Sequence, residues 1–408
     1  MLMRSAPPET RRPRLLSLFS GIGGLDAGLE ASGFETIASV EQDEYARAEL
    51  CRQRPDCRLV EELDVNLIEP GALRRQLGLR RGELELLAGG PPCQPFSRAA
   101  AWTRQRGLRD PRARTLSAFF SMVTEFAPAV VLLENVPTLA TRHDSWLSKQ
   151  LERVNTLLGT QYAFTVVSAQ AADFGVPQTR QRTFLVAQRE GLSFSAPAPT
   201  HGIARPFATA WDALANCSVS TDPQLRVTGK WAGLLETIPP GLNYLFHTDR
   251  GDGRPIFGWR RRYWSFLLKL DPSRPSWTVT ASPGPANGPF HWENRRLSAV
   301  ELAALQTYPL RAEPLVGLHA AQRLFGNAVP SLLAEVLGRE LRRQFLGQRP
   351  IGPLKLAIES RSDRPTMPRL TRAPDEWLSK RTKRTPHPGE GRGDGARKLR
   401  AERRSRAR

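Results

Sequence analysis

From Arg14 onward, the chain alternates short apolar runs with segments long enough to form helices. The runs are LLSLF (15–19), TIASV (36–40), LELLAGG (84–90), AVVLLENV (129–136), FTVVSA (164–169) and TFLVA (183–187). Near-continuous apolar runs separated by helix-length segments are typical of buried parallel strands. The alternation therefore predicts an α/β fold, with a doubly wound, mostly parallel sheet over roughly the first 190 residues.

After about residue 190 the regular apolar pattern is lost, and it returns near Leu297. The stretch from Gly191 to Pro275 holds Pro, Gly, Trp and Arg without a regular period, which predicts a separate small, irregular domain. Helical periodicity returns near Leu297, and residues 331–346 place Leu333, Val336, Leu337 and Leu341 on one helical face. The predicted division is an N-terminal extension (1–13), the α/β domain (14–190), the small domain (191–275), a return to the α/β domain (276–349) and a tail (350–408).

The charge of the chain points to a polyanionic partner such as nucleic acid. The net charge is +19, and residues 351–408 alone carry 17 basic and 7 acidic side chains, a net charge of +10. This tail is poor in apolar residues, which predicts a disordered basic arm that attracts phosphates without choosing bases. We therefore expect a protein that ends near Arg349 to fold and to keep its sequence preference.

Cysteines and apolar stretches narrow the class of protein further. No stretch approaches 18 uninterrupted apolar residues, and the N-terminal residues lack the apolar region of an export signal, so we expect a cytoplasmic protein without membrane partners. Four cysteines, at 51, 57, 93 and 217, are too few for a disulfide scaffold and do not show a zinc-ligand spacing. A functional cysteine is therefore expected to act as a free thiol, and no metal is expected.

A glycine-rich turn, FSGIGG (19–24), joins the first predicted strand to a helix. Gly21, Gly23 and Gly24 would let the backbone approach a ligand closely at the helix N-terminus. Such a turn is also a common tight connection, and dinucleotide binding is a rival interpretation. The spacing departs from G-x-G-x-x-G, and Glu41 ends the next strand, where an acid can bind ribose hydroxyls. This combination favours a nucleoside cofactor without a pyrophosphate.

Two reactive side chains follow neighbouring strands. Cys93 lies in GGPPCQPFS (89–97), a proline-stiffened loop, and Glu134 lies in ENV at the end of a later strand. Ends of parallel strands share one sheet edge, where α/β folds bind ligands, so a nucleophile and an acid would meet there. QTRQR (178–182) places Arg180 and Arg182 on the same side of an extended segment, although solvated arginines are the default in so Arg-rich a chain.

These motifs together, in this order, resemble the DNA cytosine-C5 methyltransferase family, whose members have a class I S-adenosylmethionine-dependent fold. The similarity is carried by FSGIGG, GGPPCQPFS, ENV, QTRQR, RRLSAVELAALQTYP (295–309) and GNAVP (326–330). The resemblance implies transfer of a methyl group from S-adenosylmethionine to carbon 5 of a flipped cytosine in a specific double-stranded DNA sequence.

The resemblance also implies a role for each matching residue. Cys93 would attack carbon 6 of cytosine, Glu134 would hold or protonate ring nitrogen 3, and Arg182 would contact O2 with support from Arg180. The implied cofactor-binding residues are Phe19 against adenine, Gly21, Gly23 and Gly24 in the turn, Glu41 at the ribose, Asp64 at the adenine amino group and Asn327, which would help to close the site.

By the same resemblance, residues 191–275 would form a target-recognition domain. Its densest basic and aromatic patch, GWRRRYWSF (258–266), is either a base reader, or a core of Trp259, Tyr263 and Trp264 with arginines at phosphates. We expect a monomer in a restriction–modification system, with a cognate restriction endonuclease encoded nearby. Two alternatives stay open: a tRNA cytosine-5 methyltransferase and a catalytically inactive DNA-binding regulator.

Overall fold

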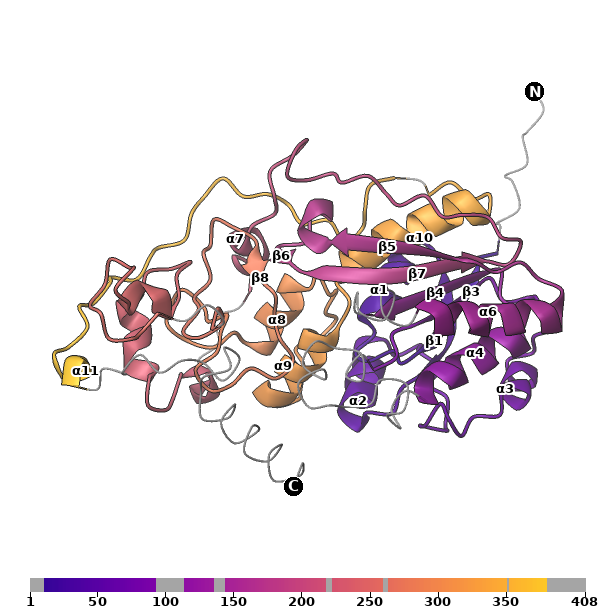
Figure 1. Cartoon of the computed structure of the whole chain (residues 1–408), viewed down its shortest axis with the longest axis horizontal. Helices are drawn as coiled ribbons and strands as arrows, with labels where there is room; N and C mark the ends of the chain where they lie inside the picture. Colours follow the sequence, from indigo (N-terminus) through magenta and orange to yellow (C-terminus); the bar gives the residue numbers. More distant parts are fainter. Residues whose placement is uncertain are drawn as a thin grey trace, which may run out of the picture.

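The computed structural model describes residues 11–92, 114–135, 144–217, 222–259, 263–350 and 352–379. An α/β region and a smaller region with little regular secondary structure lie side by side, with β6 and β8 between them (Figure 1). In the part of the chain that the structure describes, no helix is both long and apolar enough to cross a membrane.

The sheet is formed by the six apolar runs seen in the sequence. Its strands are β1 (Arg14–Leu18), β2 (Glu35–Val40), β3 (Leu86–Gly89), β4 (Val130–Asn135), β5 (Phe164–Gln170) and β7 (Gln181–Gln188), in the order β2-β1-β3-β4-β7-β5. The predicted mostly parallel α/β sheet is confirmed, with one exception: β7 runs antiparallel to both β4 and β5. The link from β5 to β7 holds only the 3-10 helix η4 (Ala171–Phe174) and the short strand β6 (Gln178–Thr179), too little for the crossover helix that a parallel pair needs.

Helices cover both faces of the sheet. One face packs against α3 (Pro70–Gln76), α4 (Arg114–Phe126) and α6 (Asp144–Leu158), and the other against α1 (Gly24–Ala31) and α10 (Ser331–Phe345). Leu16 lies in the first core and Leu15 in the second, as the alternation of side chains along a strand requires. The predicted helix at 331–346 is α10, and Leu333, Leu337 and Leu341 are fully buried.

Close packing of α1 on α10 depends on two glycines. A Cβ at Gly28 would lie 2.1 Å from the Ser331 carbonyl oxygen, and a Cβ at Gly338 would lie 2.3 Å from Ser32 Oγ. Any larger residue would force these helices apart. This contact brings the returning C-terminal part of the chain onto the first βα unit, which carries the glycine turn.

A third core joins segments on both sides of the small region. It includes α7 (Ala210–Leu214), α8 (Ala299–Leu305) and α9 (Leu318–Asn327), and β8 (Ser276–Trp277) pairs with β6 nearby. Phe194 packs in the core under α10. The contacts of Phe194 and α7 therefore place the first part of residues 191–275 with the α/β region, whereas the sequence predicted one small domain across this whole range.

The small region has its own core, built from turns rather than from strands. Its 3-10 helices are η5 (Pro223–Leu225), η6 (Ala232–Thr237) and η7 (Tyr244–His247). Its buried residues are Val227, Leu234, Leu235, Ile238, Tyr244, Ile256, Phe257, Leu267, Phe290, Ala373 and Trp377. Two of these come from the C-terminal part of the chain, beyond α10.

That C-terminal segment, residues 352–379, is a strap that runs from the α/β region to the far end of the small region (Figure 1). Its start is held by Glu335, whose carboxylate accepts the backbone N–H groups of Lys355 (2.8 Å) and Leu356 (2.9 Å). Its end, α11 (Glu376–Ser379), stacks Trp377 on Trp231 with ring centroids 5.6 Å apart.

The prediction of a disordered arm from residue 350 is wrong for the strap. Ala373 and Trp377 are apolar residues in a polar stretch. Both are buried because they pack into the core of the small region. The sequence shows no apolar period there, since only isolated residues of the strap are anchored. Residues 380–408 lie outside the described part of the chain.

Candidate active site

A pocket of about 320 Å³ opens where the carboxyl ends of β1, β2, β3 and β4 meet. It is lined by Phe19, Gly21, Gly24, Asp26, Glu41, Gln42, Asp43, Val65, Gly90, Pro91, Pro92, Thr115, Glu134, Arg182, Arg323 and Asn327, with further apolar residues between them. The carboxyl edge of an open α/β sheet is where such folds bind ligands. The pocket brings together most of the residues that the sequence singled out.

The glycine turn forms one wall of this pocket. Gly21 has a positive φ of 57°, and a Cβ there would meet nothing within 4 Å, so this position faces open space. Gly23 and Gly24 serve packing instead. A Cβ at Gly23 would lie 2.6 Å from Leu50 Cδ1, and one at Gly24 would lie 2.5 Å from the Val329 carbonyl oxygen. Gly23 is not among the lining residues.

Glu41 lies at the end of β2 and is held in place by backbone donors. One carboxylate oxygen accepts the N–H groups of Gln42 (2.9 Å) and Asp43 (2.7 Å), and the other accepts that of Gly21 (2.6 Å). Burial raises the pKa of Glu41, against the lowering effect of these hydrogen bonds. A carboxylate has about four acceptor positions, so the second oxygen keeps one for a hydroxyl donor in the pocket.

The other two predicted cofactor contacts differ from each other. Asn327, at the end of α9, lines the pocket beside Ala328. Asp64 does not, although its neighbours Leu63 and Val65 do. One oxygen of the Asp64 carboxylate accepts hydrogen bonds from the backbone and side-chain nitrogens of Asn66, at 2.9 and 2.7 Å.

Glu134 and Arg182 form an ion pair in the pocket, with Arg182 Nε 2.9 Å from Glu134 Oε1. Burial raises the pKa of Glu134 above its usual value, while the charges of Arg182 and Arg180 oppose this shift. Gly90 leaves room for the acid, because a Cβ there would lie 3.0 Å from Glu134 Oε2. The result is a half-buried carboxyl group with a raised pKa beside the Arg182 cation.

Cys93 lies outside the described residues, but the start of its loop does not. Pro91 and Pro92 line the same pocket as Glu134. Asn135, next to Glu134, donates from Nδ2 to the Pro91 carbonyl oxygen (3.1 Å). The end of β4 therefore fixes the loop two residues before the thiol.

Arg180 holds the site from outside the pocket. It is 1% exposed and donates to the carbonyl oxygens of Val279 (2.8 Å), Gly326 (2.6 Å) and Ala328 (3.0 Å). These bonds tie the QTRQR segment to the chain just after β8 (Ser276–Trp277) and to the GNAVP segment. Arg180 thus positions its neighbours, and Arg182 is the arginine of this segment that reaches the pocket.

With this geometry in place, comparison with known proteins identifies the family. The family model of C-5 cytosine-specific DNA methylases matches residues 14–343, which is most of the chain. The chain belongs to this family. Family membership favours the methylation of cytosine in DNA over the two alternatives that the sequence left open.

Relatives support the same assignment. The methyltransferase is 35% identical over 366 residues to Type II methyltransferase M.SacI from Streptomyces achromogenes, covering 81% of this chain and 93% of the relative. It is 29% identical over 334 residues to Type II methyltransferase M.NgoFVII from Neisseria gonorrhoeae, covering 79% and 84%. Methyltransferase EhMeth from Entamoeba histolytica has the same fold, with a TM-score of 0.57 and 16% identity over 82% of this chain and 99% of that one.

The sequence did not point to two ion pairs on the β1–β2 side of the pocket. Asp43 caps α2 (Glu44–Gln53) by accepting from Ala46 N, and it also pairs with Arg323 of α9. The buried Asp26 accepts from Ser17 Oγ (2.6 Å) and Arg54 Nη1 (3.1 Å). An Asp before a helical pattern is a recognisable cap, but nothing in the sequence signals its distant arginine.

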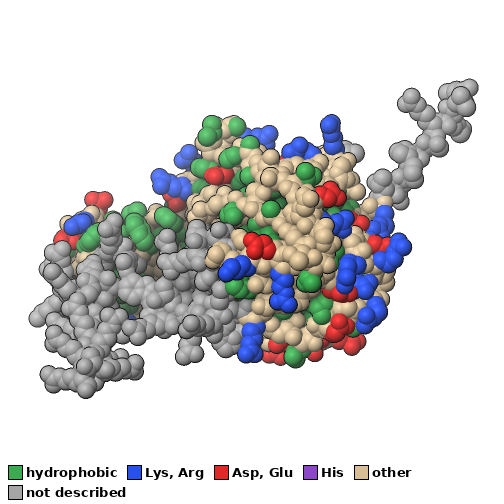
Figure 2. All heavy atoms as spheres, turned by 45° about the vertical axis from the view of Figure 1, so that its right-hand side comes forward, with side chains coloured by type: hydrophobic (Ala, Val, Ile, Leu, Met, Phe, Trp, Pro, Cys, Tyr) green, Lys and Arg blue, Asp and Glu red, His purple; other side chains and the backbone are tan. Residues whose placement is uncertain are grey.

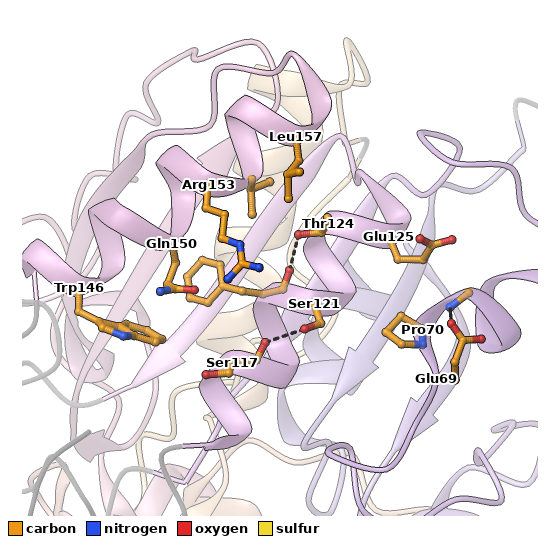
Figure 3. A pocket seen from close by; sticks show the side chains of 13 residues that line it. Glu69, Pro70, Ser117, Ser121, Thr124, Glu125, Trp146, Gln150, Arg153 and Leu157 are labelled. Atoms are coloured by element: carbon orange, nitrogen blue, oxygen red, sulfur yellow. Dashed lines mark hydrogen bonds between the residues drawn. The ribbon is translucent and has the colours of Figure 1, made fainter. Parts of the chain in front are cut away.

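A second hollow, of about 420 Å³, lies away from this site between α4 and α6 (Figure 3). The hydroxyls of Ser121 and Thr124 donate to carbonyls of their own helix, and Glu125 is held by Arg74 and Arg81. The face of the α/β region in Figure 2 mixes basic and acidic side chains, without a patch of one sign.

Among the described residues, no cluster of three His, Cys, Asp or Glu could hold a metal ion.

Proposed function

We propose that this DNA cytosine-C5 methyltransferase takes its methyl group from S-adenosylmethionine and works through a covalent bond between Cys93 and a cytosine rotated out of the duplex. The observation that carries the proposal is the half-buried Glu134–Arg182 pair beside the loop that leads to Cys93. Atoms of a base inside a stacked duplex are out of reach of such a pocket, so the nucleotide must leave the stack.

The residues of the cofactor side fit S-adenosylmethionine. Glu41 offers one carboxylate position to a ribose hydroxyl, Phe19 supplies an apolar ring, and Gly21 leaves space along the turn. Asn327 closes the pocket from α9. Both bonds from Asn66 end on one oxygen of the Asp64 carboxylate, so the other oxygen is the one proposed to accept from an adenine amino group. When bound, the cofactor supplies an electrophilic methyl group on sulfur.

Glu134 and Arg182 prepare the ring for attack. Carbon 5 of cytosine is a poor nucleophile, so the Cys93 thiolate adds to carbon 6 and pushes electron density toward carbon 5. The raised pKa of Glu134 keeps a proton available for ring nitrogen 3 as this addition proceeds. Arg182 would contact O2 and stabilise the charge there. After methyl transfer, the proton leaves carbon 5 and the thiolate is eliminated, which restores the aromatic ring.

The small region, roughly residues 222–290 together with the end of the strap, is proposed as the target-recognition domain. It lies beside the α/β region across β6 and β8 (Figure 1), and it carries Trp259 with Arg250 stacked over the ring at 4.1 Å. We further propose that the enzyme acts as a monomer in a restriction–modification system with a cognate endonuclease. Type II relatives of similar length support this context.

The test compares Cys93→Ala and Glu134→Gln with the exposed control Glu152→Gln of α6. Cys93→Ala should abolish methyl transfer but keep DNA binding, and Glu134→Gln should slow transfer about 10²- to 10⁴-fold, the usual contribution of a positioned acid. DNA with 5-fluorocytosine at the target should trap wild-type enzyme as a covalent adduct, because fluorine cannot leave carbon 5 as a proton does. Normal turnover by Cys93→Ala would refute the mechanism.

A further inference from the structure

Two tryptophans outside the assigned site are stacked on each other at the surface. Trp264 is 60% exposed and Trp277 is 49% exposed, and their ring centroids lie 6.4 Å apart with the planes 23° from parallel. Aromatic rings usually bury most of their area, and contiguous exposed apolar surface marks interaction sites. The stacked pair therefore offers an apolar surface to a binding partner.

Trp277 is joined through β6 to the segment that carries Arg182. It lies in β8 opposite Thr179 of β6, and Thr278 Oγ1 donates to the Thr179 carbonyl oxygen (2.7 Å). Three residues of extended chain, about 10 Å, separate Thr179 from Arg182. Two residues after Trp277, the Val279 carbonyl accepts the bond from Arg180 that fixes this strand to the site.

Trp264 comes from the small region on the other side. Its carbonyl oxygen accepts a hydrogen bond from Asn243 Nδ2 (3.0 Å), and Asn243 is itself nearly buried. Phe266, two residues on, packs against the small-region core. The Trp264–Trp277 pair thus spans the junction between the catalytic edge and the small region.

The pair is dispensable for the core of the small region. Trp231 contacts Phe257, Phe266 and Trp377 there, and Tyr244 contacts Phe257 and Phe266. Trp264 and Tyr263 are both exposed, so they do not form the core that one interpretation of GWRRRYWSF predicted. A stacked surface pair with no share in this core is a feature for binding.

We propose that Trp264 and Trp277 form a platform on which the nucleotide beside the target cytosine stacks while the cytosine is rotated out. This inference rests on the base rotation in the proposed function. Rotation leaves the neighbouring base without its stacking partner, and aromatic side chains replace such stacking irrespective of base identity. DNA is the occupant that the argument favours, because Trp277 pairs through β6 with the segment that leads to Arg182, which contacts Glu134 at the proposed cytosine site.

The test measures binding, base rotation and turnover in full-length Trp277→Ala, Trp264→Ala and the double variant. Base stacking is worth about 1–3 kcal/mol, so each single variant should bind cognate duplex at least about fivefold more weakly. 2-Aminopurine placed beside the target should fluoresce more in the variant complexes than in the wild-type complex, because it loses its stacking partner. Trp277→Phe should restore part of the affinity. Leu157→Ala, an exposed apolar change on α6, is the matched control.

The outcomes separate this platform from the proposed function. Unchanged affinity and fluorescence in the double variant, with wild-type enzyme active, would overturn the platform and leave the covalent mechanism intact. If wild-type enzyme gave no fluorescence rise with 2-aminopurine at the target position, base rotation itself would fail. A wild-type dimer that the double variant loses in sedimentation would assign the pair to a second copy of the chain and overturn the proposal.

Discussion

The two cores of this methyltransferase are built in different ways. The core of the α/β region takes its residues from regular strands and helices whose apolar periods recur along the chain. The small-region core takes them from 3-10 turns and aromatic contacts, and it is completed by Trp377 from the opposite end of the sequence. Local pattern thus encodes the first core, whereas the second depends on a contact between distant segments.

The difference between the two cores is tested most directly by removing the contact of Trp377 with the small-region core. Trp377→Ala should lower the stability of the small region by about 3–5 kcal/mol, the usual cost of deleting a buried tryptophan. The α/β region should stay folded, since its cores do not include this residue. Urea unfolding followed by tryptophan fluorescence should show an early transition that circular dichroism of the helices does not share.

Leu378→Ala is the matched control, because this neighbour is 37% exposed. A protein that ends at Arg349 should behave like Trp377→Ala, contrary to the expectation from the sequence that it folds and keeps its sequence preference. A protein that ends at Ser379 should keep wild-type stability. If ending the chain at Arg349 left the small region intact, the strap would be a passive covering.

In the α/β region, a single local change should affect the whole molecule instead. Gly28→Ala places a Cβ against the Ser331 backbone, which cannot move away as a flexible side chain would. Overpacking of this kind costs about 1–3 kcal/mol. Because α10 joins the sheet to the strap, fluorescence and circular dichroism should shift together. Gly317→Ala is the control, since nothing lies within 4 Å of its added Cβ. Separate transitions in Gly28→Ala would show that the two regions unfold independently.

The contrast also explains what the sequence could predict. All six strands were predictable because apolar runs reflect burial within the sheet, and α10 was predictable from its helical period. Family resemblance singled out Glu134 and Arg182 as site residues, but not the ion pair between them. The antiparallel direction of β7, the Asp43–Arg323 pair and the strap were not, because each depends on where the chain returns in space. The roles of Gly23 and Gly24 in packing were hidden for the same reason.

Buried histidines should make the stability of the protein depend on pH. His291 packs beside Trp292 near the small region, and burial, with the charges of Arg295 and Lys269, lowers its pKa to about 3 despite Glu301. The unfolded chain takes up a proton below about pH 6.5, whereas folded His291 stays neutral, so stability falls as pH drops from 6.5 toward 3. The loss should approach about 1.4 kcal/mol per pH unit at most.

Urea unfolding at pH 7.5, 6 and 5 measures this slope by tryptophan fluorescence. His291→Gln should flatten it, because glutamine has no proton to gain. His319→Gln, at an exposed position of α9, should leave the slope unchanged. An equal slope in wild type and His291→Gln would assign the acid sensitivity to other groups, such as His247, whose pKa burial also lowers.

The smallest expected effect concerns residues 380–408, which follow the strap. They carry 12 basic and 3 acidic side chains, a net charge of +9. Removing them should leave stability and the methylated sequence unchanged, because the region proposed to read the bases lies at residues 222–290 and the end of the strap. DNA affinity should fall at low salt, and the dependence of log K on log salt should become shallower by about 0.9 for each phosphate that the shortened protein no longer neutralises. A variant of full length with these basic residues replaced by Gln should behave like the truncated protein, which separates charge from chain length. A changed methylation sequence in either protein would place these residues in base recognition, and an unchanged salt slope in both would show that they do not contact DNA.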